Sequence, residues 1–210
     1  MRGLRECLSN QYIEKDNNLA KRKVKVVKTR QINTYAEMWR VSYWAMRQAE
    51  KEVKGSFFQI MASLIFTAFT LEAYLNHIGR HIFECWDDLE RLSPSAKINV
   101  IAEKLKVEKD NSIRPFQTAK KLFDFRNDVA HGKTILLKNE EQISIASEDI
   151  SNYMHKFLET DWEEYSTLDN AKRAREDVEK IITIFHNSAG ITDDILFFGG
   201  MESGSATLVQ

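Results

Sequence analysis

Four polar residues that could together cleave a phosphodiester stand close to one another in the sequence: Arg126, Asn127, Asp128 and His131. An arginine can bind a phosphate and the negative charge that grows on it in a transition state. A histidine has a pKa near neutrality, so its ring can move a proton to or from an attacking or leaving oxygen. The cluster is therefore a candidate active site.

The segment that carries these residues, 116–132, is predicted to be a helix that also anchors the core. Pro115 suits the first turn of a helix, and Gly132 suits the position just past its end. Apolar residues recur along one broad side: Phe116, Ala119, Leu122, Phe123, Phe125, Val129 and Ala130. We expect the helix to bury this side and to present its polar end.

Helical geometry separates the members of the cluster. Arg126 and His131 lie about 140° apart around an ideal helix, whereas Asn127 and His131 are one turn apart and share a face. An arginine side chain is long enough to swing back toward that face. If two copies of the helix end meet across a two-fold axis, two sets of these residues would line one groove.

The rest of the chain predicts an all-α fold. Its 210 residues suit one domain, and only 2 Pro and 8 Gly favour helices over a turn-rich β-fold. Further helices are predicted at 35–54, 57–85, 94–105, 148–158 and 168–187, and a small β-hairpin insertion after the motif helix, at 134–137 and 143–146. The helix at 57–85 is apolar almost all round, so it should lie at the centre of a bundle or between two subunits. Glu72 and Asn76 are its polar exceptions, one turn apart on one face.

Positive charge is concentrated near the N-terminus. Residues 1–35 hold nine Lys and Arg against three Asp and Glu, and the remainder is acidic. Two interpretations stay open: a basic arm that holds a nucleic-acid backbone, with Lys21, Arg22, Lys23 and Lys25, or a solvated strand or helix start. The domain plan is a basic arm at 1–35, a helical domain at 36–190 and a mobile C-terminal tail at 191–210.

Cofactor and membrane sites are not expected. His77, His81 and Cys85 recur every four residues, but no clear fourth ligand accompanies them, so we predict no metal. The most apolar window is too short and too interrupted to span a membrane, and no signal peptide is visible. Two cysteines do not make a disulfide framework, which favours the cytoplasm.

The chain resembles the HEPN superfamily, whose hallmark is an arginine, usually followed by a polar residue, and a histidine four to six positions on. Here the match is RNDVAHG, from Arg126 to Gly132. The segments FTAFTLEAYLNHIG (66–79), LSPSAKINVIAEKLKV (92–107) and DVEKIITIFHNSAG (177–190) resemble the second, connecting and last helices of that bundle. The resemblance covers residues 36–190.

The resemblance implies a metal-independent endoribonuclease that acts as a homodimer with one composite site, without a cofactor. In that case His131 is the general acid or base for attack of the ribose 2′-OH, and Arg126 stabilises the transition state. Asn127 would orient the phosphate or His131, and Asp128 would fix Arg126 or the imidazole. Glu72 would brace Arg126.

Many members of the family are toxins or antiviral effectors, often with a neutralising antitoxin or a sensor partner. Lys133 stands where some toxin members have a tyrosine, two positions after the histidine. It is also a candidate RNA contact.

Three alternatives remain open. His131 could be only a helix cap, favourable against the C-terminal dipole. A HEPN fold could serve as a non-catalytic dimer that binds a protein or a nucleotide. A plain helical bundle could also use its basic arm to bind nucleic acid without specificity.

Overall fold

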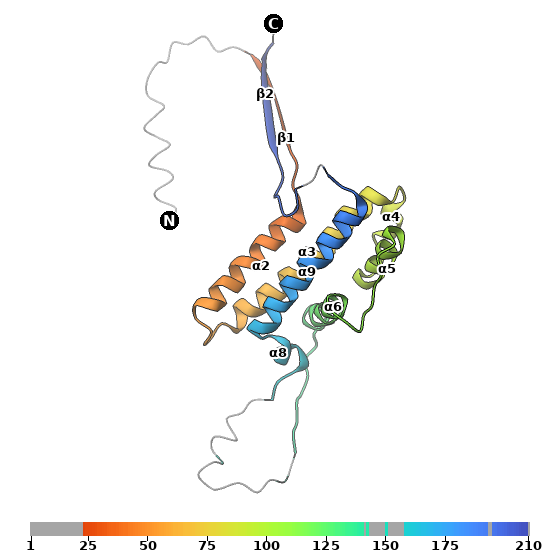
Figure 1. The fold of residues 1–210 in the computed structure, drawn as a ribbon. Coiled ribbons are helices and arrows are strands. Elements are labelled where there is room, and N and C mark those ends of the chain that lie inside the picture. The colour runs from red at the N-terminus through yellow and green to blue at the C-terminus, as the bar shows by residue number, and fades with distance from the viewer. Residues whose placement is uncertain (1–22, 141, 143–149, 151–157, 193–194, 210) are drawn as a thin grey trace, which may run out of the picture. The chain divides into compact units, whose positions relative to one another are not determined.

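The computed structural model describes residues 23–140, 142, 150, 158–192 and 195–209. Two compact units emerge: a helical bundle at 33–199, and a small unit that pairs the segment before residue 33 with the segment from residue 200. The bundle contains α2 (Thr34–Lys51), α3 (Phe57–Ile82), α4 (Trp86–Leu89), α5 (Pro94–Leu105), α6 (Phe116–Ala130), α8 (Asp161–Tyr165) and α9 (Leu168–Ala189) (Figure 1). The predicted mostly helical fold is confirmed.

Helix α3 is the centre of the bundle. It packs against α2, α5, α6 and α9, and its residues Leu64, Leu71 and Leu75 are wholly buried. Among the described residues it is also the helix long and apolar enough to cross a membrane, by length and composition only. Half of its most apolar window is buried inside the bundle.

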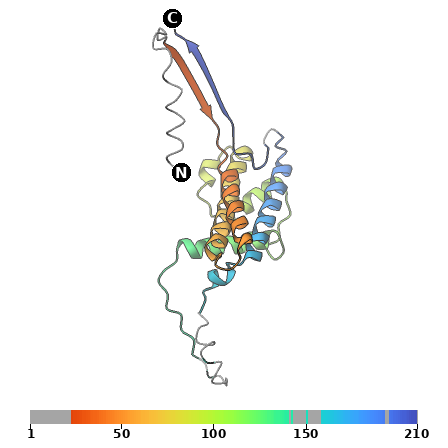
Figure 2. The same cartoon turned by 90° about the vertical axis from the view of Figure 1, so that its left-hand side faces the viewer.

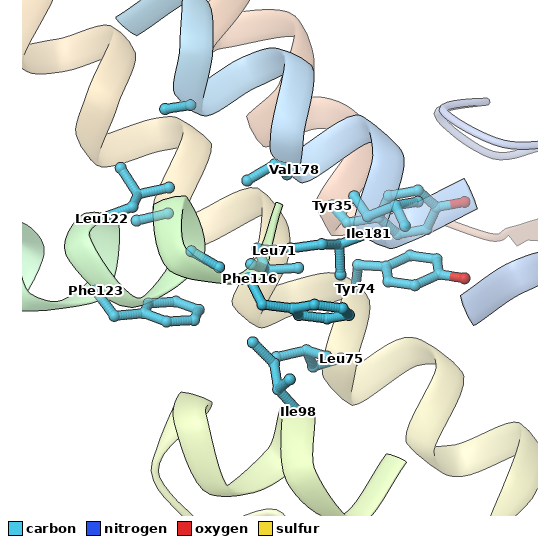
Figure 3. Packing of buried hydrophobic residues seen from close by; sticks show 14 of the residues in the cluster. Tyr35, Leu71, Tyr74, Leu75, Ile98, Phe116, Leu122, Phe123, Val178 and Ile181 are labelled. Carbon is cyan, nitrogen blue, oxygen red and sulfur yellow. The ribbon is translucent and has the colours of Figure 1, made fainter. Parts of the chain in front are cut away.

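The apolar side of α6 is buried as predicted. Phe116, Leu122 and Phe123 are at most 5% exposed, and the ring centroids of Phe116 and Phe185 are 6.2 Å apart. Figure 3 shows the side chains of α3, α5, α6 and α9 gathered in one cluster. This packing fixes the axis of α6 and therefore the place where its polar end emerges.

Helix ends follow the local sequence signals. Ser93 caps α5, because its Oγ accepts a hydrogen bond from the Ala96 N–H at 3.3 Å, and Pro94 occupies the first turn. Gly190 ends α9 in the left-handed conformation with φ of 66°, which glycine adopts without strain. The residues of α9 predicted to be buried are fully so: Val178, Ile181, Ile182 and Phe185.

The antiparallel sheet is present, but not where a hairpin was predicted. Its strands are β1 (Val24–Arg30) and β2 (Glu202–Leu208), with Val27 opposite Ser205. Residues 134–137 are exposed and form no strand, because no described residue pairs with them. The second predicted hairpin strand, 143–146, and almost all of the predicted helix 148–158 lie outside the described residues.

The two ends of the chain also differ from the domain plan. The expected basic arm and the expected mobile tail pair with each other as β1 and β2. Pairing between segments so far apart in sequence leaves no local pattern, whereas a helix is visible in its own periodicity.

Candidate functional site

The C-terminal end of α6 forms one wall of an open hollow of about 520 Å³. The hollow brings together four of the predicted site residues: Asn127, Asp128, His131 and Lys133. Residues of the following segment and of the α8 start complete it: Gly132, Ile135, Leu137, Glu159, Thr160, Asp161 and Trp162. Asn127 and His131, which were predicted to share a helix face, therefore both line this hollow.

His131 is the C-cap residue of α6, and its imidazole ring can contact solvent or a ligand. Its backbone N–H donates to the Asn127 carbonyl at 2.8 Å and closes the last turn. The side chain is exposed, and it makes no hydrogen bond or ion pair with the residues that the structure describes. An imidazole without such partners can accept or release a proton from a bound molecule.

Arg126 does not line the hollow. Its Nη2 donates to Glu72 Oε2 of α3 at 2.6 Å, and the two side chains are only 16% and 30% exposed. The expected contact between Glu72 and Arg126 is present. Arg126 also stays apart from His131, as the helical angles predict, because its guanidinium contacts Glu72 of α3 and does not turn toward the hollow.

One donor of Arg126 remains unsatisfied. Its Nε is buried and has no hydrogen-bond partner within the described part of the chain. A buried donor without an acceptor typically costs about 1–3 kcal/mol. Because this Nε is buried, neither a phosphate nor a second protein chain reaches it while the side chain keeps this position.

A buried lysine accompanies this ion pair, and sequence reasoning missed it. Lys97 of α5 is 3% exposed, and its Nζ donates to Asn76 Oδ1 of α3 at 2.8 Å. Burial lowers the pKa of Lys97. The negative charges of Glu72 and Glu90 oppose this lowering, and the positive charge of Arg126 adds to it. The available signal was its spacing, because Lys97 is four residues before the buried Ile101 and shares its face.

The residues Glu72, Asn76, Lys97 and Arg126 therefore form a polar cluster where α3, α5 and α6 meet. It explains why Glu72 and Asn76 interrupt an otherwise apolar helix. Glu72 contacts Arg126, as expected from the sequence, and Asn76 accepts from Lys97, a partner that was not predicted.

Within one chain the hollow is acidic. Asp128, Glu159 and Asp161 line it, against His131 and Lys133. Such a surface repels a phosphate unless further positive charge is added. Arg126, the arginine of the predicted cluster, does not add its charge to this hollow.

The α8 wall of the hollow was also missed. Thr160 and Glu163 form a capping box, in which Thr160 Oγ1 accepts from the Glu163 N–H at 3.4 Å and the Thr160 N–H donates to Glu163 Oε2 at 2.8 Å. The T-x-x-E spacing is a known start signal for a helix and could have been found in the sequence.

The remaining candidate residues lie elsewhere. The rings of His77 and His81 are 4.8 Å apart between centroids, and no three His, Cys, Asp or Glu side chains in the described ranges are grouped so as to hold a metal ion. Lys21 and Arg22 lie outside the described residues, and Lys23 and Lys25 belong to the strand unit.

Comparison with known proteins found no matching family model, no matching curated protein and no matching solved structure. The functional assignment is therefore argued from the residues and their geometry.

Proposed function

We propose that this protein is a HEPN-type, metal-independent endoribonuclease whose active site is completed by a second copy of the chain. The observation that carries the proposal is the division of the motif. His131 stands exposed at the hollow, and Glu72 holds Arg126 of the same helix outside the hollow. Proton transfer and charge stabilisation, the two functions that RNA cleavage needs, are thus both present and held on α6.

The chemistry follows from these side chains. His131 takes the proton from a ribose 2′-OH, and the 2′-oxygen attacks the adjacent phosphorus. The bond to the 5′-oxygen breaks, and that oxygen receives a proton from solvent, so the products are a 2′,3′-cyclic phosphate and a 5′-OH. Arg126 stabilises the charge on the phosphorane-like transition state, Asn127 orients the phosphate, and Asp128 orients the imidazole.

The charge of the hollow does not favour RNA within one chain. Three carboxylates face His131 and Lys133 within one chain, so RNA binding there needs positive charge from elsewhere. A two-fold arrangement would supply another Arg126, His131 and Lys133 together with the carboxylates of the second hollow, so its contribution is the second set of catalytic groups.

An exposed apolar surface on α3 is the proposed docking site for that copy. Ile65 and Phe69 lie seven and three residues before Glu72, so all three lie on one side of α3. Phe69 is 39% exposed, and Phe58, about two turns before Ile65, is 71% exposed. This stripe leads to the Glu72–Arg126 pair, so a second copy docked on it would lie beside the arginine. Large exposed apolar side chains in a row are typical of interaction surfaces.

The family resemblance also suggests a cellular role for the protein. We infer a toxin or antiviral effector of the cytoplasm, controlled by an antitoxin or a sensor partner. RNA is the substrate, and no cofactor takes part in the steps above.

Cleavage of RNA in EDTA tests the proposal. Wild-type protein should release fragments that end in a 2′,3′-cyclic phosphate, and His131→Ala should lower the rate by about 10²–10⁴-fold. Arg126→Gln should also lower it, whereas His81→Ala, an exposed histidine away from the hollow, is the matched control. Equal cleavage by His131→Ala, or cleavage only with a divalent metal, contradicts the proposal.

A second candidate is a non-catalytic HEPN dimer that binds a nucleotide or a protein. The hollow favours it in one respect: about 520 Å³ is within the range of small-molecule sites, and Trp162 offers a ring for a base to stack on. In that case His131→Ala would leave partner binding or cell toxicity intact, and Trp162→Ala would reduce it.

A further inference from the structure

The β-ribbon formed by β1 and β2 is open on both faces. Every residue of the two strands is exposed, from Val24 to Arg30 and from Glu202 to Leu208. Figure 2 shows the strands running antiparallel to each other. An isolated two-stranded ribbon is only marginally stable in water, so it would gain from a partner that contacts one of its faces.

The register gives the ribbon two different faces, because directly paired residues point to the same side. Thr29 Oγ1 and Ser203 Oγ lie 2.6 Å apart, which shows this for one pair. One face consists of Lys25, Val27, Thr29, Ser203, Ser205 and Thr207. It carries hydroxyl groups and an ammonium group but no carboxylate.

The opposite face is mixed. The end with Val24 and Leu208 is apolar, and the end with Arg30 and Glu202 is charged. The whole face consists of Val24, Val26, Lys28, Arg30, Glu202, Gly204, Ala206 and Leu208. Glu202, opposite Arg30, is the carboxylate of the described ribbon.

The ribbon carries a surplus of positive charge. Lys23, Lys25, Lys28 and Arg30 stand against Glu202, and none of the four cations has an ion pair within the ranges that the structure describes. Like charge on two ribbons disfavours pairing with a second copy. Ammonium, guanidinium and hydroxyl donors together match the contacts that proteins make with phosphate oxygens.

We propose that the β-ribbon is an RNA-binding element that holds the phosphate backbone of a single strand. The choice of RNA over DNA rests on the proposed function, whereas the charge and the hydroxyl face do not. No aromatic side chain lies on the described ribbon, so bases have no ring to stack on. Binding is therefore directed at the backbone and tolerates any sequence.

Fluorescence anisotropy with a labelled single-stranded RNA of about 20 nucleotides measures this binding. All proteins are full-length and carry His131→Ala, so that the strand stays intact. The triple variant Lys25→Gln, Lys28→Gln and Arg30→Gln should bind at least tenfold more weakly at low salt. The slope of log affinity against log salt should fall by about 2, because each lost phosphate contact removes about 0.7.

Two further variants keep the result interpretable. Lys51→Gln, Lys121→Gln and Lys180→Gln remove the same charge from exposed positions on the bundle and should leave the slope unchanged. Glu202→Gln removes a carboxylate from the ribbon and should tighten binding severalfold, which unfolding of the ribbon would not produce.

Several outcomes overturn the inference. They are an equal loss in the bundle control, no loss in the ribbon variant, tighter binding of a DNA duplex than of the RNA, and ribbon variants that change self-association instead of RNA binding. Failure of the proposed catalysis is a separate result, because cleavage is measured with an intact His131 and binding without it.

Discussion

At the scale of single residues, the site depends on the ion pair between α3 and α6. Arg126 is 16% exposed and Glu72 30% exposed, so solvent weakens their attraction less than it weakens that of a surface pair. The pair fixes the direction of the guanidinium. Without Glu72 the arginine would be free to rotate toward the hollow or into solvent.

A double-mutant cycle on free energies of unfolding measures this pair. Glu72→Ala and Arg126→Ala should couple by about 1–2 kcal/mol, because each charge is left in a partly buried place without its partner. The control is Glu37 and Arg40, whose side chains are 40% and 57% exposed and 3.3 Å apart. Their coupling should stay below about 0.5 kcal/mol. A Glu72–Arg126 coupling as small as that of the control would show that the pair does not hold the arginine.

Lys97 predicts a dependence of stability on pH. Burial lowers the pKa of the folded Lys97 below its ordinary value of 10.5. Between the lowered pKa and 10.5 the unfolded chain binds more protons than the folded one, so the free energy of unfolding rises with pH. Lys97→Met removes this contribution. The free energy of unfolding of the wild type minus that of the variant, measured by urea unfolding, should therefore become more positive as the pH rises toward 10.5.

The matched control for that experiment is Lys120→Met on the exposed side of α6. If the free energy of unfolding of the wild type minus that of Lys97→Met stays constant or becomes more negative with rising pH, the buried position of the ammonium group is contradicted.

Part of the site could be predicted from residue types and spacing alone. Helical angles were enough to place Asn127 with His131 and to separate Arg126 from them. The partner of Arg126 could also be suggested, because Glu72 is an isolated charge on an apolar helix. For Lys97 the spacing to Ile101 was the one weak signal, since a lysine is usually on the surface and its burial results from the packing of α5 on α3.

At the scale of elements, α6 joins the core to the site. Its first turns fill space between α3, α5 and α9, and its last turn supplies His131. The position of the imidazole is therefore set by packing of the apolar half.

Leu122→Ala tests that role of α6. Leu122 is wholly buried, so its truncation should lower the free energy of unfolding by about 2–5 kcal/mol through lost burial and a cavity. Leu136→Ala is the control, because Leu136 is 93% exposed and the change should stay within about 0.5 kcal/mol. Urea unfolding followed by circular dichroism measures both, and a loss at Leu122 no larger than the control would mean that α6 is not anchored there.

Helices were predictable, and the sheet was not, for a physical reason. A helix satisfies its hydrogen bonds within itself, so caps such as Ser93 and Gly190 and a 3.6-residue period mark it locally. A strand needs a partner. The apolar run at 134–137 has strand-like residues but no partner in the described chain, whereas β1 finds its partner in residues 202–208.

At the scale of the whole molecule, the proposal depends on a second copy. One chain places His131 in an acidic hollow and Arg126 outside it, so neither the charge nor the set of groups is complete. The exposed stripe with Phe58 and Phe69 is the surface on which we expect that copy to dock.

Mixing two inactive variants tests this most directly. Arg126→Ala and His131→Ala proteins are combined, allowed to exchange subunits, and assayed for RNA cleavage in EDTA beside each variant alone and the wild type. A shared site retains one Arg126 and one His131 in every mixed dimer, so the mixture should cleave clearly faster than either variant. If wild type cleaves RNA and the mixture is no more active than the separate variants, the second copy does not complete the site.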